Sequence, residues 1–200
     1  MKWMIGALGT LCVAATPLSA LAANADGDYA VSGAGSQSCE RFVTAVEQND
    51  ESAALFTRWI EGYATGLNAN LDETFDVSPF ASANPLTQLT LWVCRNNTEA
   101  LVEQALAEVI VALEPVKTRE ASEPREMSHQ GESVMVRPAT LRLAQQRLTT
   151  FGHYASTIDG LYGPGTRRAL IAFQEEAGLD TTGLPDAATL IALLINQDDN

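Results

Sequence analysis

The chain has 200 residues and a formal net charge of −13 at pH 7. This excess of acid makes nucleic acid and anionic lipid poor partners, because both repel a negatively charged surface. The acid is unevenly spread: residues 26–108 carry thirteen Asp and Glu against three Arg, whereas residues 137–200 carry seven against five Arg. The asymmetry predicts two different surfaces on one chain.

The first residues have the composition of an export signal. Lys2 precedes an apolar run over residues 4–15, and Pro17 and several small residues follow it. A positive start, an apolar stretch and a small-residue end are typical of a secretory signal peptide, and this run is too short to span a bilayer. We expect a signal peptide over residues 1–22, cut after Ala22 or Ala25. The mature protein would then lie in the periplasm, without stable membrane insertion.

The expected mature chain keeps two cysteines, Cys39 and Cys94. An even number of cysteines in an oxidising compartment indicates a disulfide, and two cysteines allow one pairing. In the chain-entropy model, closing this loop stabilises the fold by about 4 kcal/mol. We therefore expect a Cys39–Cys94 bond.

Residues 36–113 show helical periodicity and no alternating strand pattern. One helix is expected from Cys39, and three more follow Ser52, Asn84 and Thr98, each of which can act as an N-cap. The disulfide would join the first helix to the third. The segment is thus predicted to be a disulfide-stapled four-helix domain.

Two glycines and three aromatic residues of this domain have a structural interpretation. Gly62 and Gly66 lie four residues apart and therefore on one helix face, where glycine costs about 1 kcal/mol relative to alanine. Close approach of a neighbouring helix is the simplest compensation. Trp59, Tyr63 and Trp92 are expected to lie mostly in the core, and the solvent surface is expected to be acidic.

Residues 114–135 contain no aromatic residue, Leu or Ile, and charged residues, Ser and Pro predominate. Such a stretch cannot bury enough apolar surface to offset its ordering entropy. We expect a flexible linker with a mean span of about 25 Å.

Residues 136–196 predict three further helices, so the expected fold class is all-α. Gly178 can end the second of these helices and Asp186 can cap the third. The loops at 159–166 and 182–186 repeat one pattern, in which Gly, Leu and Pro precede a helix. The expected core residues are Leu148, Leu161, Phe173 and Leu193.

The string Asp-Gly-x-Tyr-Gly-Pro-x-Thr at residues 159–166, followed by Phe-Gln at 173–174, resembles the three-helix peptidoglycan-binding domain of the type 1 family. The resemblance covers about residues 137–196 and implies attachment to the cell wall. Aromatic rings stack on sugars, and Arg or amide groups bond hydroxyls and carboxylates. A turn or cap role is the alternative for Asp159 and Thr166. The candidate peptidoglycan-binding residues are Tyr154, Asp159, Tyr162, Thr166, Arg167 and Gln174.

Residues 36–113 contain Trp-x-x-Gly-Tyr-x-x-Gly from Trp59 to Gly66, together with the two cysteines. This segment resembles a family of small periplasmic helical proteins that includes the Tai-like immunity proteins against type VI secretion amidases. Acid-stress chaperones of the HdeA type have a broadly similar architecture. The aromatic residue that often precedes the second cysteine in the family is absent here, so the resemblance implies no shared partner.

The expected mature chain has two histidines, His129 and His153, and neither lies in the four-helix domain. A zinc hydrolase needs several ligands in one fold, and the cysteines are assigned to a disulfide, so no catalytic residue, metal site or cofactor is expected. A glycosidase needs only carboxylates and stays open.

The expected function is that of a non-catalytic periplasmic protein that binds peptidoglycan. It would tether an acidic helical domain, whose partner could be an envelope protein or a wall-hydrolase effector. The alternatives are a periplasmic stress chaperone, whose many carboxylates would be neutralised on acidification, and a cryptic cell-wall glycosidase.

Overall fold

The computed structural model describes residues 28–82 and 84–195. The predicted signal peptide lies outside these residues. The described residues from Val31 onward form one compact unit. Within the described ranges, no helix has the length and apolar character needed to cross a membrane.

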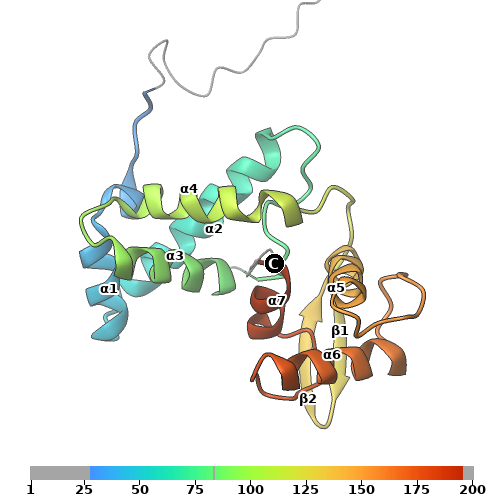
Figure 1. Ribbon diagram of the computed structural model, residues 1–200. Coiled ribbons are helices and arrows are strands. Elements are labelled where there is room, and N and C mark those ends of the chain that lie inside the picture. The colour runs from blue at the N-terminus through green and yellow to red at the C-terminus, as the bar shows by residue number, and fades with distance from the viewer. Residues whose placement is uncertain (1–27, 83, 196–200) are drawn as a thin grey trace, which may run out of the picture. The chain divides into compact units, whose positions relative to one another are not determined.

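Four α-helices make up the first segment: α1 (Cys39–Glu47), α2 (Ala53–Asn70), α3 (Asn84–Asn96) and α4 (Val102–Leu113), preceded by the 3-10 helix η1 (Gly33–Ser36) (Figure 1). The prediction of four helices is confirmed. Two of the expected caps differ, because Ser52 makes no side-chain cap bond and α4 begins at Val102. Gln104 Oε1 accepts the Leu101 N–H at 3.0 Å and holds the start of α4.

The predicted disulfide is present. Cys39 begins α1, Cys94 lies near the end of α3, and their Cα atoms are 4.8 Å apart. Both cysteines are fully buried. The bond therefore joins the first helix to the third, as the sequence predicted.

The described chain is mostly helical, as predicted, but the segment expected to be a flexible linker contains regular structure, including a small sheet. Residues after α4 form the 3-10 helix η2 (Glu114–Val116) and an antiparallel hairpin of β1 (Arg125–His129) and β2 (Glu132–Val136). Between them, the Thr118 N–H donates to the Asp76 carbonyl at 2.9 Å. Gln130 and Gly131, both at positive φ, make the two-residue turn that closes the hairpin.

Three helices follow: α5 (Pro138–Thr150), α6 (Pro164–Glu176) and α7 (Ala187–Leu194). Proline opens α5 and α6, where its missing N–H has no helical partner to lose. Asp186 Oδ1 accepts the Thr189 N–H at 2.9 Å and caps α7, as predicted. Gly178, at φ +67°, follows α6 as the expected C′ glycine.

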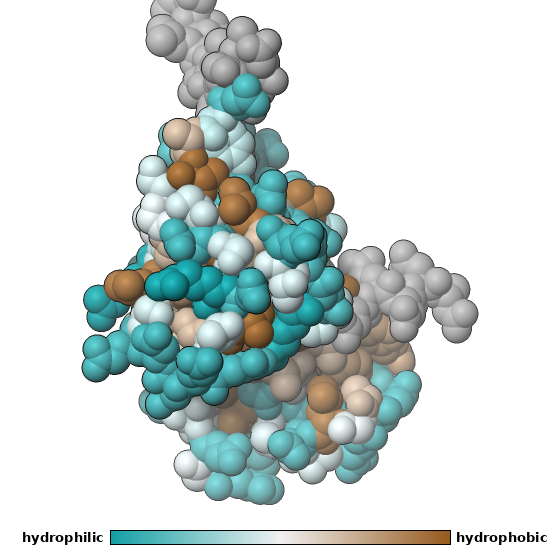
Figure 2. Space-filling view, turned by 90° about the vertical axis from the view of Figure 1, so that its left-hand side faces the viewer, coloured by the Kyte–Doolittle hydropathy of each residue, from teal (hydrophilic) through white to brown (hydrophobic). Residues whose placement is uncertain are grey.

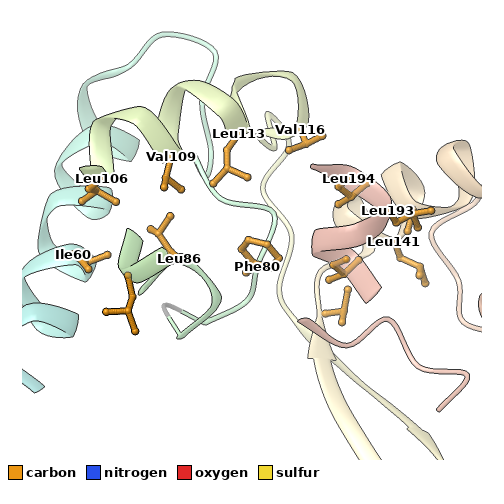
Figure 3. Packing of buried hydrophobic residues seen from close by; sticks show 14 of the residues in the cluster. Ile60, Phe80, Leu86, Leu106, Val109, Leu113, Val116, Leu141, Leu193 and Leu194 are labelled. Atoms are coloured by element: carbon orange, nitrogen blue, oxygen red, sulfur yellow. The ribbon is translucent and has the colours of Figure 1, made fainter. Parts of the chain in front are cut away.

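Buried apolar residues of both segments form one continuous core. Figure 3 shows Phe80 between Leu86 of α3 and Leu141 of α5. A buried hydrogen bond reinforces this contact, because the Thr140 hydroxyl donates to the Pro79 carbonyl at 2.7 Å. The α2–α3 connection therefore packs directly on α5.

Two expected core residues lie in solvent instead. Trp92 is 65% exposed and Leu161 is 56% exposed. The expected close approach at Gly62 and Gly66 is also wrong, since a Cβ at either position would meet no atom within 4 Å. Figure 2 shows one face of the molecule as mostly hydrophilic, with separate hydrophobic patches.

Candidate functional site

One buried side chain, Gln145 of α5, holds the loop between α5 and α6. Its Nε2 lies 3.1 Å from the Asp159 carboxylate, 3.1 Å from the Thr166 hydroxyl and 3.2 Å from the Leu161 carbonyl. Its Oε1 accepts the N–H groups of Asp159 and Gly160 at 3.0 and 2.8 Å. Because a buried amide must satisfy its donors and acceptors, this network fixes the loop.

Gln174 of α6 repeats the arrangement in the next loop. Its Nε2 donates toward the Thr182 hydroxyl, the Leu184 carbonyl and the Thr189 hydroxyl, at 3.0, 3.0 and 2.8 Å. Its Oε1 accepts the Gly183 N–H at 2.8 Å. The internal repeat of the sequence is therefore also a repeat of hydrogen bonding.

Three of the six candidate binding residues lie inside the fold. Gln174 and Thr166 are buried in the two networks, and Tyr154 is 7% exposed, with its hydroxyl donating to the Thr157 carbonyl at 2.7 Å. In this structure these side chains position the loops and present no surface to a large ligand.

The other three candidates, Asp159, Tyr162 and Arg167, reach the surface. The Leu161 N–H bonds the Asp159 carboxylate at 2.8 Å, and this bond, with Gln145, lowers the pKa of Asp159 below its ordinary value. The Tyr162 hydroxyl donates to the Gly183 carbonyl at 2.8 Å. Partial burial raises the pKa of Tyr162, although the positive charge of Arg167 opposes the shift.

Sequence reasoning missed two exposed apolar residues beside Tyr162. Leu161 is 56% exposed and Ile158 is 39% exposed, whereas Leu184, the repeat equivalent of Leu161, is 1% exposed. Both leucines follow a glycine in the same pattern, so the sequence carried no signal that only one would be covered. Ile158, Leu161, Tyr162 and Arg167 are called the loop face below.

The β1–β2 hairpin adds a neighbour to the loop face. A Cβ on Gly183 would lie 3.0 Å from Arg167 Cγ and 3.2 Å from His129 Cδ2, so the end of β1 packs beside Arg167. The loop face thus combines apolar, aromatic and cationic groups. Such a set can stack on a sugar ring and bond a carboxylate.

A second polar site lies in a cavity of about 370 Å³ lined by Glu61, Asn68, Asp76 and Arg137, among others. An Asp76 carboxylate oxygen lies 3.4 Å from Arg137 Nη2, and the other accepts the Ser78 N–H at 3.1 Å. Burial raises the pKa of Asp76 above its ordinary value, against the effect of these partners. Its oxygens hold the local loop, which is a structural use of the carboxylate.

In the described part of the chain, no group of three or more His, Cys, Asp or Glu residues is placed to hold a metal ion.

Residues 137–193 match the family described as "Putative peptidoglycan binding domain". The match covers α5, α6 and nearly all of α7, together with both glutamine networks. The recognition of this domain from the sequence is therefore confirmed. Residues 36–113 lie outside the match, and their resemblance to immunity proteins and chaperones stays a prediction.

Two curated proteins are similar to parts of the chain. "Putative OxPP cycle protein OpcA" of Synechococcus elongatus is 49% identical over 49 residues, which are 24% of this chain and 11% of that protein. "Localization factor PodJL" of Caulobacter vibrioides is 40% identical over 57 residues, 28% of this chain and 6% of that protein. The chain thus spans a small fraction of each relative. No solved structure matches it.

Proposed function

We propose that this protein binds peptidoglycan through the loop face and holds its helical segment, residues 39–113, at the cell wall. The observation that carries the proposal is the matched peptidoglycan-binding domain. Its signature loop, residues 159–166, is held by Gln145, which accepts two N–H groups of the loop. A rigid loop loses little conformational entropy on binding, so its exposed groups are suited to recognition.

Co-sedimentation of the mature chain with purified sacculi tests the proposal. Arg167 and Arg168 are adjacent on α6 and have the same charge, but only Arg167 belongs to the loop face. We expect Arg167→Gln to weaken the affinity for sacculi by about tenfold, and so to lower the sedimented fraction, because a charge-assisted hydrogen bond is lost. Arg168→Gln should bind like the wild type. A wild-type chain that stays in the supernatant at all salt concentrations would refute the proposal.

The proposed role is non-catalytic. Asp76 is the described carboxylate with a raised pKa, and it is engaged with Arg137 and Ser78. Zymography on purified sacculi separates this role from the glycosidase alternative. A cleared band that disappears in Asp76→Asn or Glu61→Gln would establish hydrolysis.

The helical segment is proposed to bind a protein partner in the periplasm, either an envelope protein or a wall-hydrolase effector. Three of its large apolar side chains stand in solvent: Leu55 at 59%, Trp92 at 65% and Val111 at 75% exposure. The disulfide supports an oxidising compartment. Cross-linking in the periplasm, with Trp92→Ala as the variant and Arg95→Ala as the control, would identify a partner that depends on this surface.

A further inference from the structure

A groove follows the outer face of α5, beside residues 115–120. Two adjoining cavities of about 240 and 180 Å³ lie there and share Leu143 and Gln146 in their walls. Residues of both η2 and the segment after it form the opposite side. The groove, called the α5 groove below, exists because residues 115–120 pack on the helix instead of forming a loose linker.

The α5 groove is cationic in a strongly acidic chain. Four of the twelve Lys and Arg residues line it, whereas Glu120 is the one acid in its walls. Arg142 pairs with Glu120 at 2.6 Å, and Lys117 pairs with Glu114 at 3.0 Å. The other two cations of the groove, Arg119 and Arg147, make no ion pair with any residue in the described ranges 28–82 and 84–195. A local positive excess of this kind attracts an anion.

A buried hydroxyl gives independent evidence of a ligand. Thr118 lines the groove and is 3% exposed, yet its Oγ1 has no hydrogen-bond partner among the described residues. The main chain of Thr118 is held by Asp76, whose carbonyl accepts its N–H at 2.9 Å. An unpaired buried hydroxyl destabilises the fold, and a bound acceptor or donor would remove this cost.

We infer that the α5 groove binds a carboxylate-bearing peptide, the stem peptide of peptidoglycan. This inference rests on the proposed function. Guanidinium groups bind carboxylates in bidentate geometry, which suits Arg119 and Arg147. The Thr118 hydroxyl and the Gln146 amide bond peptide groups, and Leu143 contacts the methyl groups of alanine residues.

The groove adjoins the loop face, so one wall fragment can occupy both. A Cβ on Gly160 would lie 3.0 Å from Arg142 Cγ, so the aliphatic part of the Arg142 side chain lies against the signature loop. Arg142 also lines the groove. The glycan strand would then lie on the loop face and its peptide in the α5 groove.

Calorimetric titration of the mature chain with soluble probes tests this assignment. The probe is the tripeptide L-alanyl-γ-D-glutamyl-diaminopimelate; the comparison probes are the same peptide with amidated carboxyls and chitotetraose, which has no peptide. We expect the tripeptide to bind and its amidated form to bind at least about tenfold more weakly. Equal binding of the two peptides would overturn the inference.

Variants locate the site. Arg119→Gln combined with Arg147→Gln should weaken tripeptide binding by about tenfold or more, and Thr118→Val should also weaken it. Thr118→Val loses no internal side-chain hydrogen bond of the described residues, so its unfolding midpoint should not fall. Arg168→Gln, which removes the same charge from α6, is the control and should leave binding unchanged.

The two proposals fail in different ways. If the wild type sediments with sacculi but the tripeptide does not bind, or binds all variants equally, the groove assignment is overturned and wall binding stands. If the wild type does not sediment with sacculi, the proposed function is overturned. Tripeptide binding that weakens in the groove variants and not in Arg168→Gln supports the assignment.

Discussion

Gln145 and Gln174 each hold one of two consecutive loops by hydrogen bonds. Each is fully buried at 0% exposure, and each bonds the backbone of a loop and a threonine in the first turn of the next helix. A long amide suits this role because it both donates and accepts at one point. The loop face owes its fixed shape to the first of these side chains.

A substitution at Gln145 should therefore unfold the protein more easily. Gln145→Ala leaves the N–H groups of Asp159 and Gly160 without their acceptor, and we expect a loss of about 3–5 kcal/mol in the free energy of unfolding. Gln146→Ala, at the exposed neighbouring position, should change it by less than about 0.5 kcal/mol. Urea unfolding of both variants checks the contrast, and equal effects would contradict the structural role of Gln145.

Two aspartates should titrate in opposite directions. Burial raises the pKa of Asp76 above 3.8 despite its partners, whereas hydrogen bonds to Leu161 and Gln145 lower the pKa of Asp159 below 3.8. As the pH falls toward 3.8, the folded state takes up the Asp76 proton first, so the stability contributed by that group rises. The contribution of Asp159 is present above 3.8 and is lost as the pH falls through its lowered pKa. NMR titration of the carboxyl carbons measures both shifts, and shifts of the same sign would contradict this assignment.

The residues of the candidate site were only partly predictable. The motif names Asp159 and Tyr162 as readily as Gln174, although Gln174 is buried and the other two reach the surface, whereas Arg167 follows the motif loop at an unspecified position. Residues that face a ligand are told from residues that support a loop by the exposure of their side chains. That exposure depends on packing between segments that are distant in the sequence. Leu161 illustrates the limit: its position in the repeat equals that of Leu184, but their neighbours differ, and one is exposed.

Helix α2 carries two glycines that no neighbouring helix explains. Gly62 and Gly66 are exposed, and a Cβ at either position would stand in open space. Each glycine therefore weakens the helix without a compensating contact inside the described fold.

Alanine at these positions should stabilise the protein. Gly62→Ala and Gly66→Ala each add helix propensity, and we expect an increase of about 1 kcal/mol in the free energy of unfolding for each. Gly35→Ala is the contrasting variant, because its Cβ would overlap the Trp59 ring. It should destabilise the protein. Thermal unfolding distinguishes the three, and a destabilised Gly62→Ala would indicate a contact that the structure lacks.

The helices were more predictable than the segment that connects them. Helical periodicity located all seven α-helices of the described chain, since each buries one face along a regular spacing. The caps expected at Ser52 and Thr98 were wrong. The hairpin at 125–136 escaped because its strands lack the alternation of buried and exposed residues that marks a strand: only Met127 of β1 and Val136 of β2 are buried. Its turn, Gln130-Gly131, also lacks the Asn or Asp that usually marks such turns.

The two helical segments share their core. Phe80, Leu113 and Val116 belong to the same buried cluster as Leu141 and Leu194 (Figure 3). The Arg137–Asp76 pair at 3.4 Å joins the start of α5 to the α2–α3 connection. The shared core and this ion pair attach the helical segment firmly to α5, in contrast to the loose attachment that a flexible linker would give.

Unfolding of residues 31–195 should therefore be one cooperative transition. Trp59 and Trp92 report on the helical segment, and amide hydrogen exchange in α5, α6 and α7 reports on the peptidoglycan-binding domain. Because one core spans both, we expect the two signals to change at the same urea concentration. Thr140→Val removes the bond to the Pro79 carbonyl and should lower both midpoints together, whereas Thr150→Val, at the exposed end of α5, should leave them unchanged. Two separate transitions in the wild type would mean that residues 114–135 act as a linker after all, and that the segments fold independently.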